Sequence, residues 1–150
     1  DIAVESARSN SEITTRVITA NEVDMWAATS AAAWATEHES LADFMLNFGR
    51  ITANCPGSQP WLAERGGKPI ATGMMFVHEG VAILAGASTI PEERNRGAQN
   101  ALLSSRLRSA AETGCTLAIM GALPGSQAQI HAQQNGINIA YTRTNWQLKG

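Results

Sequence analysis

The sequence predicts an α/β (α+β) fold: a mixed central sheet with an antiparallel meander, a β-α-β crossover and flanking helices. Three short apolar runs separated by glycine turns predict the meander, over residues 61–64, 70–77 and 81–90. A helical pattern over 97–113, followed by a short apolar run at 117–123, predicts the crossover, because parallel neighbouring strands need such a connection.

The first half of the chain predicts a strand and two helices. Residues 1–12 are polar and aperiodic, so we expect a flexible N-terminal segment followed by one domain over 13–150. The β-branched run 13–19 has the composition of a strand. Asn21 is a good N-cap for a first helix, and Ser40 for a second. The apolar stripe expected on the second helix comprises Leu41, Phe44, Met45 and Phe48.

The second half predicts two helices and two further strands. Gly86, inside the third apolar run, indicates a bulge or the close approach of another backbone or a ligand. Gly114 ends the crossover helix, and a capping box at 126–129 opens a short helix that ends near Gly136. The segment 137–148 alternates in part, as a terminal strand or hairpin does. The buried face expected on the crossover helix comprises Leu103, Leu107, Ala110 and Ala111.

The composition argues against several classes of protein. A net charge of −2 gives no whole-molecule attraction to nucleic acid. No run approaches the ~18 apolar residues of a membrane span, and the N-terminus lacks a signal-peptide pattern, so we expect a cytoplasmic protein without a membrane partner. Cys55 and Cys115 belong to no Cys/His cluster, so we expect no metal site.

The segment with a chemical signature runs from a strand end through a basic turn into the start of a helix. Amide groups at a helix N-terminus have no intrahelical acceptor, and the helix dipole adds partial positive charge. Arg94 and Arg96 add formal charge, and Gly97 removes a side chain where a phosphate must approach the backbone. This turn therefore suits a pyrophosphate, although it matches neither the P-loop nor the dinucleotide glycine pattern.

The same turn resembles the acetyl-coenzyme A signature of the GNAT N-acetyltransferase superfamily, R/Q-x-x-G-x-G/A. Arg94, Gly97 and Gln99 occupy its three defining positions, and Gln99 replaces the usual glycine or alanine. The larger side chain either narrows the pyrophosphate turn or points outward and adds a hydrogen bond. The order of the expected elements is similar to the whole GNAT topology. Within 124–143, PGS followed by YTR also resembles a motif of a subset of these acetyltransferases.

The resemblance implies acetyl-coenzyme A as co-substrate, no metal, and an unidentified primary amine as acceptor. It implies direct attack of the amine on the thioester within a ternary complex, with an N–H near Ala87 or Ser88 polarising the carbonyl. Homodimers are common in the superfamily, so a second copy is a possible partner. The backbone contacts implied for pantetheine are Ala87, Ser88, Thr89 and Ile90. The phosphate turn implied comprises Arg94, Asn95, Arg96, Gly97, Ala98, Gln99 and Asn100.

The groups that would move protons are less well defined. His131 and Ala132 stand where many members of the superfamily have asparagine and tyrosine. His131 either bonds the coenzyme, protonates the departing thiolate, or packs or meets solvent. Tyr141 either packs in the core, makes a structural hydrogen bond or lines the acceptor pocket. The run 81–90 contains no carboxylate to act as a base. Other candidate bases, each also readable as a solvated loop charge, are Glu37, His38, Glu39 and Glu79.

Two functions from different classes therefore stay open. One is an N-acetyltransferase acting on a small molecule, a peptide or a protein. The other is an acetyl-coenzyme A binding or sensing module with little catalytic activity, which Gln99, Ala132 and the acid-free strand favour. Trp34 and Trp61 either pack in the core or line an acceptor pocket.

Overall fold

The computed structural model describes residues 10–35 and 39–148, and it has a mixed five-stranded sheet. The strands lie in sequence order, and all neighbours are antiparallel except the last pair. The strands are β1 (Ile13–Val17), β2 (Ser58–Arg65), β3 (Lys68–His78), β4 (Val81–Thr89) and β5 (Leu117–Met120). The antiparallel meander and the parallel return after a helix are both confirmed.

The two meander turns have the backbone that their residues predict. Gly66 and Gly67 have φ of 57° and 74° between β2 and β3, and Glu79 and Gly80 have φ of 47° and 77° between β3 and β4. Two consecutive positive φ angles match the right-handed twist of a hairpin, and glycine adopts them without a Cβ penalty.

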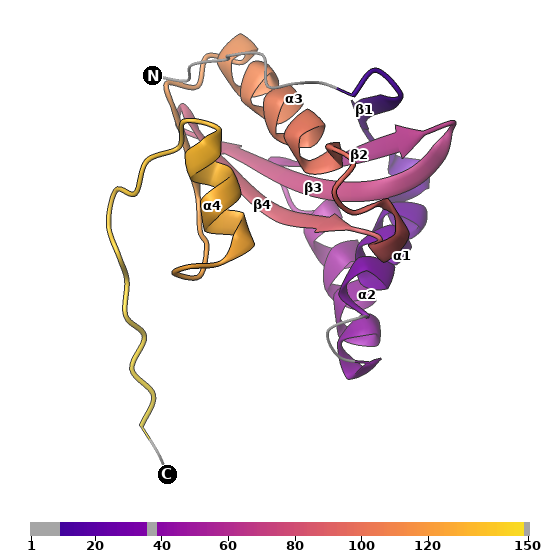
Figure 1. Cartoon of the computed structure of the whole chain (residues 1–150), viewed down its shortest axis with the longest axis horizontal. Coiled ribbons are helices and arrows are strands. Elements are labelled where there is room, and N and C mark those ends of the chain that lie inside the picture. The colour runs from indigo at the N-terminus through magenta and orange to yellow at the C-terminus, as the bar shows by residue number, and fades with distance from the viewer. Residues whose placement is uncertain (1–9, 36–38, 149–150) are drawn as a thin grey trace.

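Helices cover both faces of the sheet (Figure 1). Helices α1 (Val23–Trp34) and α2 (Glu39–Ala53) lie on one face, and α3 (Ala98–Glu112) lies on the other. Successive side chains of β3 point to opposite faces of the sheet. Met74 therefore packs in the cluster with α1 and Met75 in the cluster with α3. The short elements are the 3₁₀ turns η1 (Ala20–Glu22) and η2 (Pro91–Glu93) and the helix α4 (Gln127–Gln134).

The first helix begins differently from the sequence prediction. Thr19, not Asn21, caps the 3₁₀ turn that leads into α1. Its backbone N–H donates to Glu22 Oε2 at 2.7 Å, which completes a capping box. Asn21 lies within the turn because this box forms two residues earlier.

The apolar stripe expected on α2 is only partly buried. Phe44 is 60% exposed and Phe48 is 47% exposed, and their rings stack on each other with centroids 5.7 Å apart. The helix instead packs closely at Gly49, where an added Cβ would lie 3.1 Å from the Cβ of Ala27. Close approach at a glycine places the two phenylalanines on the outer side of the helix.

The crossover helix also differs in detail from its predicted face. Leu103, Leu107 and Ala110 are buried as expected, but Ala111 is exposed. Arg106 is buried in its place, 4% exposed, so the inward face of α3 contains a charged residue.

The expected terminal strand does not form. After α4, residues 138–148 are exposed and extend away from the sheet (Figure 1), and Tyr141 is 79% exposed. A strand needs a partner for its N–H and C=O groups, and the short β5 has no such pairing with this segment. The prediction of a strand or hairpin at 137–148 is therefore wrong for a single chain.

Candidate functional site

β4 has a strand neighbour on its β5 side along only half of its length. The parallel ladder joins Val81–Leu84 to Leu117–Met120 and ends there. Beyond it, Ala85, Gly86 and Ala87 are exposed. The backbone of these three residues, which we call the open edge of β4, is therefore available to an extended ligand.

A bulge lies within the open edge. Thr72 pairs with Ser88 and Met74 pairs with Ala85, so Gly86 and Ala87 together oppose a single residue of β3. Gly86 has a φ of 59°, and an added Cβ would lie 3.2 Å from the Cβ of Met74. The bulge predicted from the glycine is confirmed, and both its backbone angle and its close contact favour glycine.

The open edge leads into an uncapped helix N-terminus. The chain passes from β4 through η2, and then Asn95 and Gly97 have φ of 60° and 90° immediately before α3. The Gly97 carbonyl accepts the first helical bond, from the N–H of Ala101 at 3.0 Å, and no side chain caps the helix. The amides of the first turn and the helix dipole thus form a place for an anion.

The arginines of this turn already have protein partners. Glu93 accepts from Arg65 Nε at 2.9 Å and lies 3.4 Å from Arg96 Nε, and Arg65 lowers the pKa of the Glu93 carboxyl. Arg94 donates from Nη2 to the Ala33 carbonyl at the end of α1, at 3.1 Å. A phosphate bound here would share both predicted arginines with these groups.

The Gln99 side chain does not point outward, which contradicts one of the two alternatives that the sequence left open. Its Nε2 donates to the Ser88 carbonyl at 2.9 Å and to Thr89 Oγ1 at 3.0 Å. Beneath it, the hydroxyls of Thr72 and Ser88 lie 2.7 Å apart in a buried contact. The side chain therefore points inward and fastens the start of α3 to the end of β4.

His131 contacts the start of α3 from α4. Its Nε2 is hydrogen-bonded to Asn100 Oδ1, and Asn135 Nδ2 donates to the His131 carbonyl at 2.8 Å. Because an amide oxygen only accepts, this contact assigns the proton to Nε2. Partial burial and, second, the charge of Arg106 lower the pKa of His131, so the imidazole is neutral at neutral pH.

The other candidate residues lie elsewhere. Glu79 is in the β3–β4 turn, at the opposite end of β4 from the phosphate turn. Tyr141 lies on the extended C-terminal segment and makes no hydrogen bond to the described residues. The backbone of Glu39 begins α2, but its side chain lies outside the described structure, as do Glu37 and His38 entirely. Trp61 is buried in the core as expected.

Trp34 is half-buried at the end of α1, next to the carbonyl group that Arg94 contacts. Its indole N–H is buried without a hydrogen-bond partner in the part of the chain that the structure describes. The sequence did not predict Asn135, which bonds the His131 carbonyl, or Arg106, whose charge lowers the pKa of His131. No motif marks them, and a lone arginine in a helix is ordinarily solvated.

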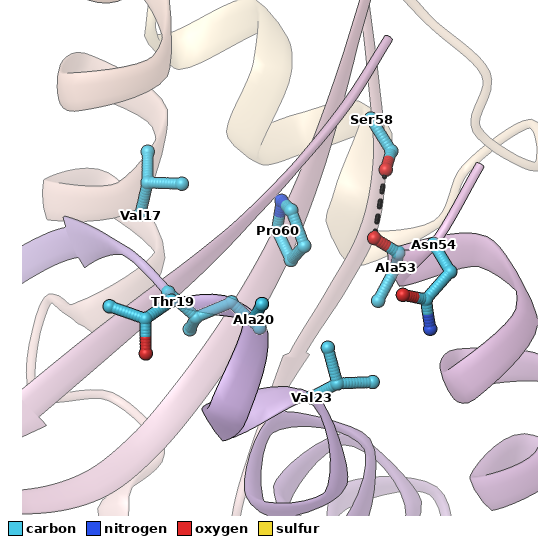
Figure 2. A pocket seen from close by; sticks show the side chains of 9 residues that line it. Val17, Thr19, Ala20, Val23, Ala53, Asn54, Ser58 and Pro60 are labelled. Carbon is cyan, nitrogen blue, oxygen red and sulfur yellow. Dashed lines mark hydrogen bonds between the residues drawn. The ribbon is translucent and has the colours of Figure 1, made fainter. Parts of the chain in front are cut away.

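A separate shallow pocket of about 200 Å³ lies between the end of β1 and the helices α1 and α2 (Figure 2). Ser58 Oγ donates to the Ala53 carbonyl at its side, at 3.0 Å. Its lining residues are Val17, Ile18, Thr19, Ala20, Val23, Ala53, Asn54, Ser58 and Pro60. None belongs to the open edge or the phosphate turn, so the pocket is not part of the candidate site.

Comparisons with protein-family models and with curated protein sequences gave no match. Solved structures are similar in fold. Aminoglycoside N-acetyltransferase AAC(6')-Iy, in complex with the bisubstrate analogue CoA-S-monomethyl-acetylneamine, is 17% identical with a TM-score of 0.72, and the match covers 93% of this chain and 100% of that chain. The 6'-N-acetyltransferase AAC(6')-Ih from Acinetobacter baumannii is 20% identical with a TM-score of 0.68, covering 91% and 98%. A transcriptional regulator from Bacillus halodurans C-125 is 14% identical with a TM-score of 0.66, covering 91% and 99%.

The protein therefore has an α/β acyltransferase-type fold with an interrupted parallel strand pair. More particularly, it has the fold of the GNAT N-acetyltransferases. Within residues 10–35 and 39–148, none of the helices has the length and apolar character needed to cross a bilayer. The same ranges contain no group of three or more His, Cys, Asp or Glu side chains placed to hold a metal ion.

Proposed function

We propose that the chain is an acetyl-coenzyme A-dependent N-acetyltransferase whose acceptor is a primary amine. One observation carries the proposal: the open edge of β4 leads directly into the uncapped N-terminus of α3. An extended thioester ligand with a pyrophosphate needs both parts in this order, a backbone edge for the pantetheine arm and an anion site for the phosphates.

The donor site would use backbone more than side chains. Ala87, Ser88, Thr89 and Ile90 would bond the pantetheine arm, and the first amides of α3 would bond the pyrophosphate beside Gly97. The left-handed backbone of Gly97 supports this assignment, since it leaves no side chain between the phosphate and those amides. The side-chain contacts proposed for the turn come from Arg94, Asn95, Arg96 and Asn100, whereas Gln99, whose side chain points inward, would contribute its backbone amide.

In the proposed reaction the amine nitrogen forms a bond to the thioester carbon and the carbon–sulfur bond breaks. The amine loses a proton, and the coenzyme leaves as a thiolate that takes one up. An N–H near Ala87 or Ser88, at the end of the open edge, would stabilise the charge that develops on the carbonyl oxygen.

His131 is the proposed proton donor or coenzyme contact on the α4 side. Its position beside Asn100 in the first turn of α3 supports the coenzyme contact, whereas the donor role would require the neutral imidazole to take up a proton first. Glu39 is proposed as a base and Tyr141 as a contributor to the acceptor pocket, as the sequence suggests. Tyr141 would have to reach a site from a second copy or from a refolded C-terminal segment, since it is 79% exposed in one chain.

A homodimer in the cytoplasm is the proposed form of the protein. Residues 138–148 are exposed and β-branched in part, and β5 is an edge strand whose Leu117 and Ile119 are 49% and 44% exposed. Each copy thus has an unpaired apolar segment and an unpaired edge, and exchange between two copies would satisfy both.

Aminoglycosides are the first acceptors to test, because two of the similar structures are named as aminoglycoside acetyltransferases.

The second candidate function is an acetyl-coenzyme A sensor with little turnover. Ala132 favours it, being buried at the position where the superfamily often has a tyrosine acid. One similar structure is named as a transcriptional regulator, so proteins with this fold are also named for roles other than catalysis.

Two measurements separate these functions. Calorimetric titration with acetyl-coenzyme A, with dephospho-coenzyme A as a control, tests the donor site. Release of free thiol with neamine, sisomicin and simple primary amines then tests transfer. Binding with amine-dependent thiol release supports the enzyme, binding without it supports the sensor, and no binding contradicts both.

A further inference from the structure

Arg106 is a buried cation on the inward face of α3. Arg106 is 4% exposed and forms no ion pair with the carboxylates of the described chain. Burial lowers its pKa to about 10, so it still carries its charge at neutral pH. Charged side chains are almost never fully buried unless they are paired, and an unpaired buried charge costs free energy unless hydrogen bonds satisfy it. The burial of Arg106 therefore needs a physical explanation, which its hydrogen bonds provide.

Those contacts go to backbone carbonyl groups of both strands, β3 and β4, at one end of the bulge. Nη1 donates to the Met74 carbonyl of β3 at 3.0 Å and to the Ala85 carbonyl of β4 at 3.3 Å. Nε donates to the Leu102 carbonyl of its own helix at 3.2 Å. Met74 and Ala85 form the last regular pair before the bulge, so one guanidinium joins α3, β3 and β4 at the point where the open edge begins.

The surrounding backbone leaves space for this group. An added Cβ on Gly73 would lie 2.9 Å from Arg106 Cζ, and Gly73 is the β3 residue that faces the bulge. A bulge disrupts the regular ladder, and carbonyls at a buried disruption need another donor. Here the guanidinium supplies it.

We propose that Arg106 is a positioning residue for acetyl transfer: by joining the Met74 and Ala85 carbonyls it fixes the direction of the open edge, Ala85–Ala87, against the thioester. The inference rests on the proposed function, because it assigns a task to that edge. It differs from a packing role, since an apolar residue of similar volume fills the space but leaves both carbonyls without this donor.

The test compares Arg106→Met, Arg106→Lys and Gly73→Ala with Arg108→Met as the matched control. Arg108 is an exposed arginine of the same helix, so its loss removes an equal charge without touching the bulge. Gly73→Ala keeps the charge and displaces the guanidinium instead, which covers the case in which Arg106→Met does not fold. Each variant is assayed for kcat, for KM of acetyl-coenzyme A, and for amide hydrogen exchange at Gly86 and Ala87.

We expect Arg106→Met and Gly73→Ala to lower kcat about 10- to 100-fold, the effect of a small misplacement at a reacting centre, with KM for acetyl-coenzyme A unchanged. Exchange of the two bulge amides should quicken about tenfold while the β2–β3 amides keep their rates. Arg106→Lys should not restore kcat, because lysine has no counterpart of Nε, whose bond to the Leu102 carbonyl holds the guanidinium in its direction.

Other results overturn the proposal. If Arg106→Met and Gly73→Ala have the same kcat and the same amide exchange rates as Arg108→Met, Arg106 has no positioning role. If Arg106→Lys has the wild-type kcat, the positive charge alone suffices. If the wild-type chain releases no thiol with any amine, the proposed function fails, and exchange at Gly86 and Ala87 still decides whether Arg106 fixes the edge.

Discussion

Replacing Gly97 with alanine changes the phosphate turn by one methyl group. Gly97 has a φ of 90°, and the atom nearest to an added Cβ is the Cβ of Asn10 at 3.8 Å, an ordinary contact. The cost to the fold is therefore backbone strain alone, about 1–2 kcal/mol for a residue held in the left-handed region. For a chain of this size, about 2–4 °C of melting temperature is lost per kcal/mol.

The effect on ligand binding should be separate and larger. The added methyl group lies where the proposed pyrophosphate approaches the first amides of α3, and a hydrogen bond to a charged group contributes about 1.5–3 kcal/mol. Loss of one such bond weakens acetyl-coenzyme A binding by about tenfold or more.

Gly114→Ala is the matched control for this variant. Gly114 has a φ of 84° at the other end of α3, and an added Cβ there has nothing within 4 Å. Both variants should lose similar stability in thermal unfolding, and only Gly97→Ala should lose affinity in calorimetry. Equal affinities for acetyl-coenzyme A in the two variants would refute the assignment of the turn.

Three further outcomes are expected. Gln99→Ala should cost about 1–2 kcal/mol of stability through its inward hydrogen bonds and leave acetyl-coenzyme A affinity unchanged; a large loss of affinity in calorimetry would contradict the inward orientation. Hydrogen bonds from Arg16 lower the pKa of Glu22 from 4.5 to about 2, so the ionised carboxylate stabilises the fold above pH 4.5, and this stability is lost as the pH falls toward 2. Denaturant unfolding across that window should therefore show a weaker pH dependence for Glu22→Gln, and an identical slope would argue against the linkage. A chain ending at Gly136 should sediment as a monomer and the full chain as a dimer, and equal sedimentation would reject the exchange of residues 137–148 between copies.

Local signals predicted most of the fold. Glycine pairs and Glu79-Gly80 placed the meander turns, and Gly86 marked the bulge, because positive φ angles and missing side chains leave direct traces in a sequence. Ser126 accepts from the N–H of Gln129 at 3.2 Å as the capping box requires, although the Gln129 side chain bonds Gly125 in place of the cap residue.

The predictions that failed have a common physical cause. In each case the packing partners in the tertiary structure determine the outcome, and the local sequence does not contain them. Phe44 has the spacing of a core residue, yet the close contact at Gly49 turns it outward. Arg106 has the character of a surface residue, yet a disrupted ladder above it provides carbonyl groups that need a donor. The segment 137–148 has strand composition, but composition supplies no second strand to pair with.

The phosphate turn shows the same division. Gly97 and the helix start were predicted from residue types alone, whereas the partners of Arg94, Arg96 and Gln99 were not. Long side chains reach groups distant in sequence, and the carbonyl of Ala33 is 61 residues away from Arg94. Side-chain direction in such a turn therefore follows from the tertiary structure.

The exposed C-terminal segment also makes the protein an optical reporter of its own assembly. Trp146 is 93% exposed, whereas Trp26 and Trp61 are 3% and 8% exposed. Indole emission shifts to longer wavelength in water, so Trp146 contributes the red edge of the fluorescence spectrum and is the indole most open to a soluble quencher. Any partner that covers the segment would move this emission to the blue while leaving the core tryptophans unchanged, so assembly can be followed without a label.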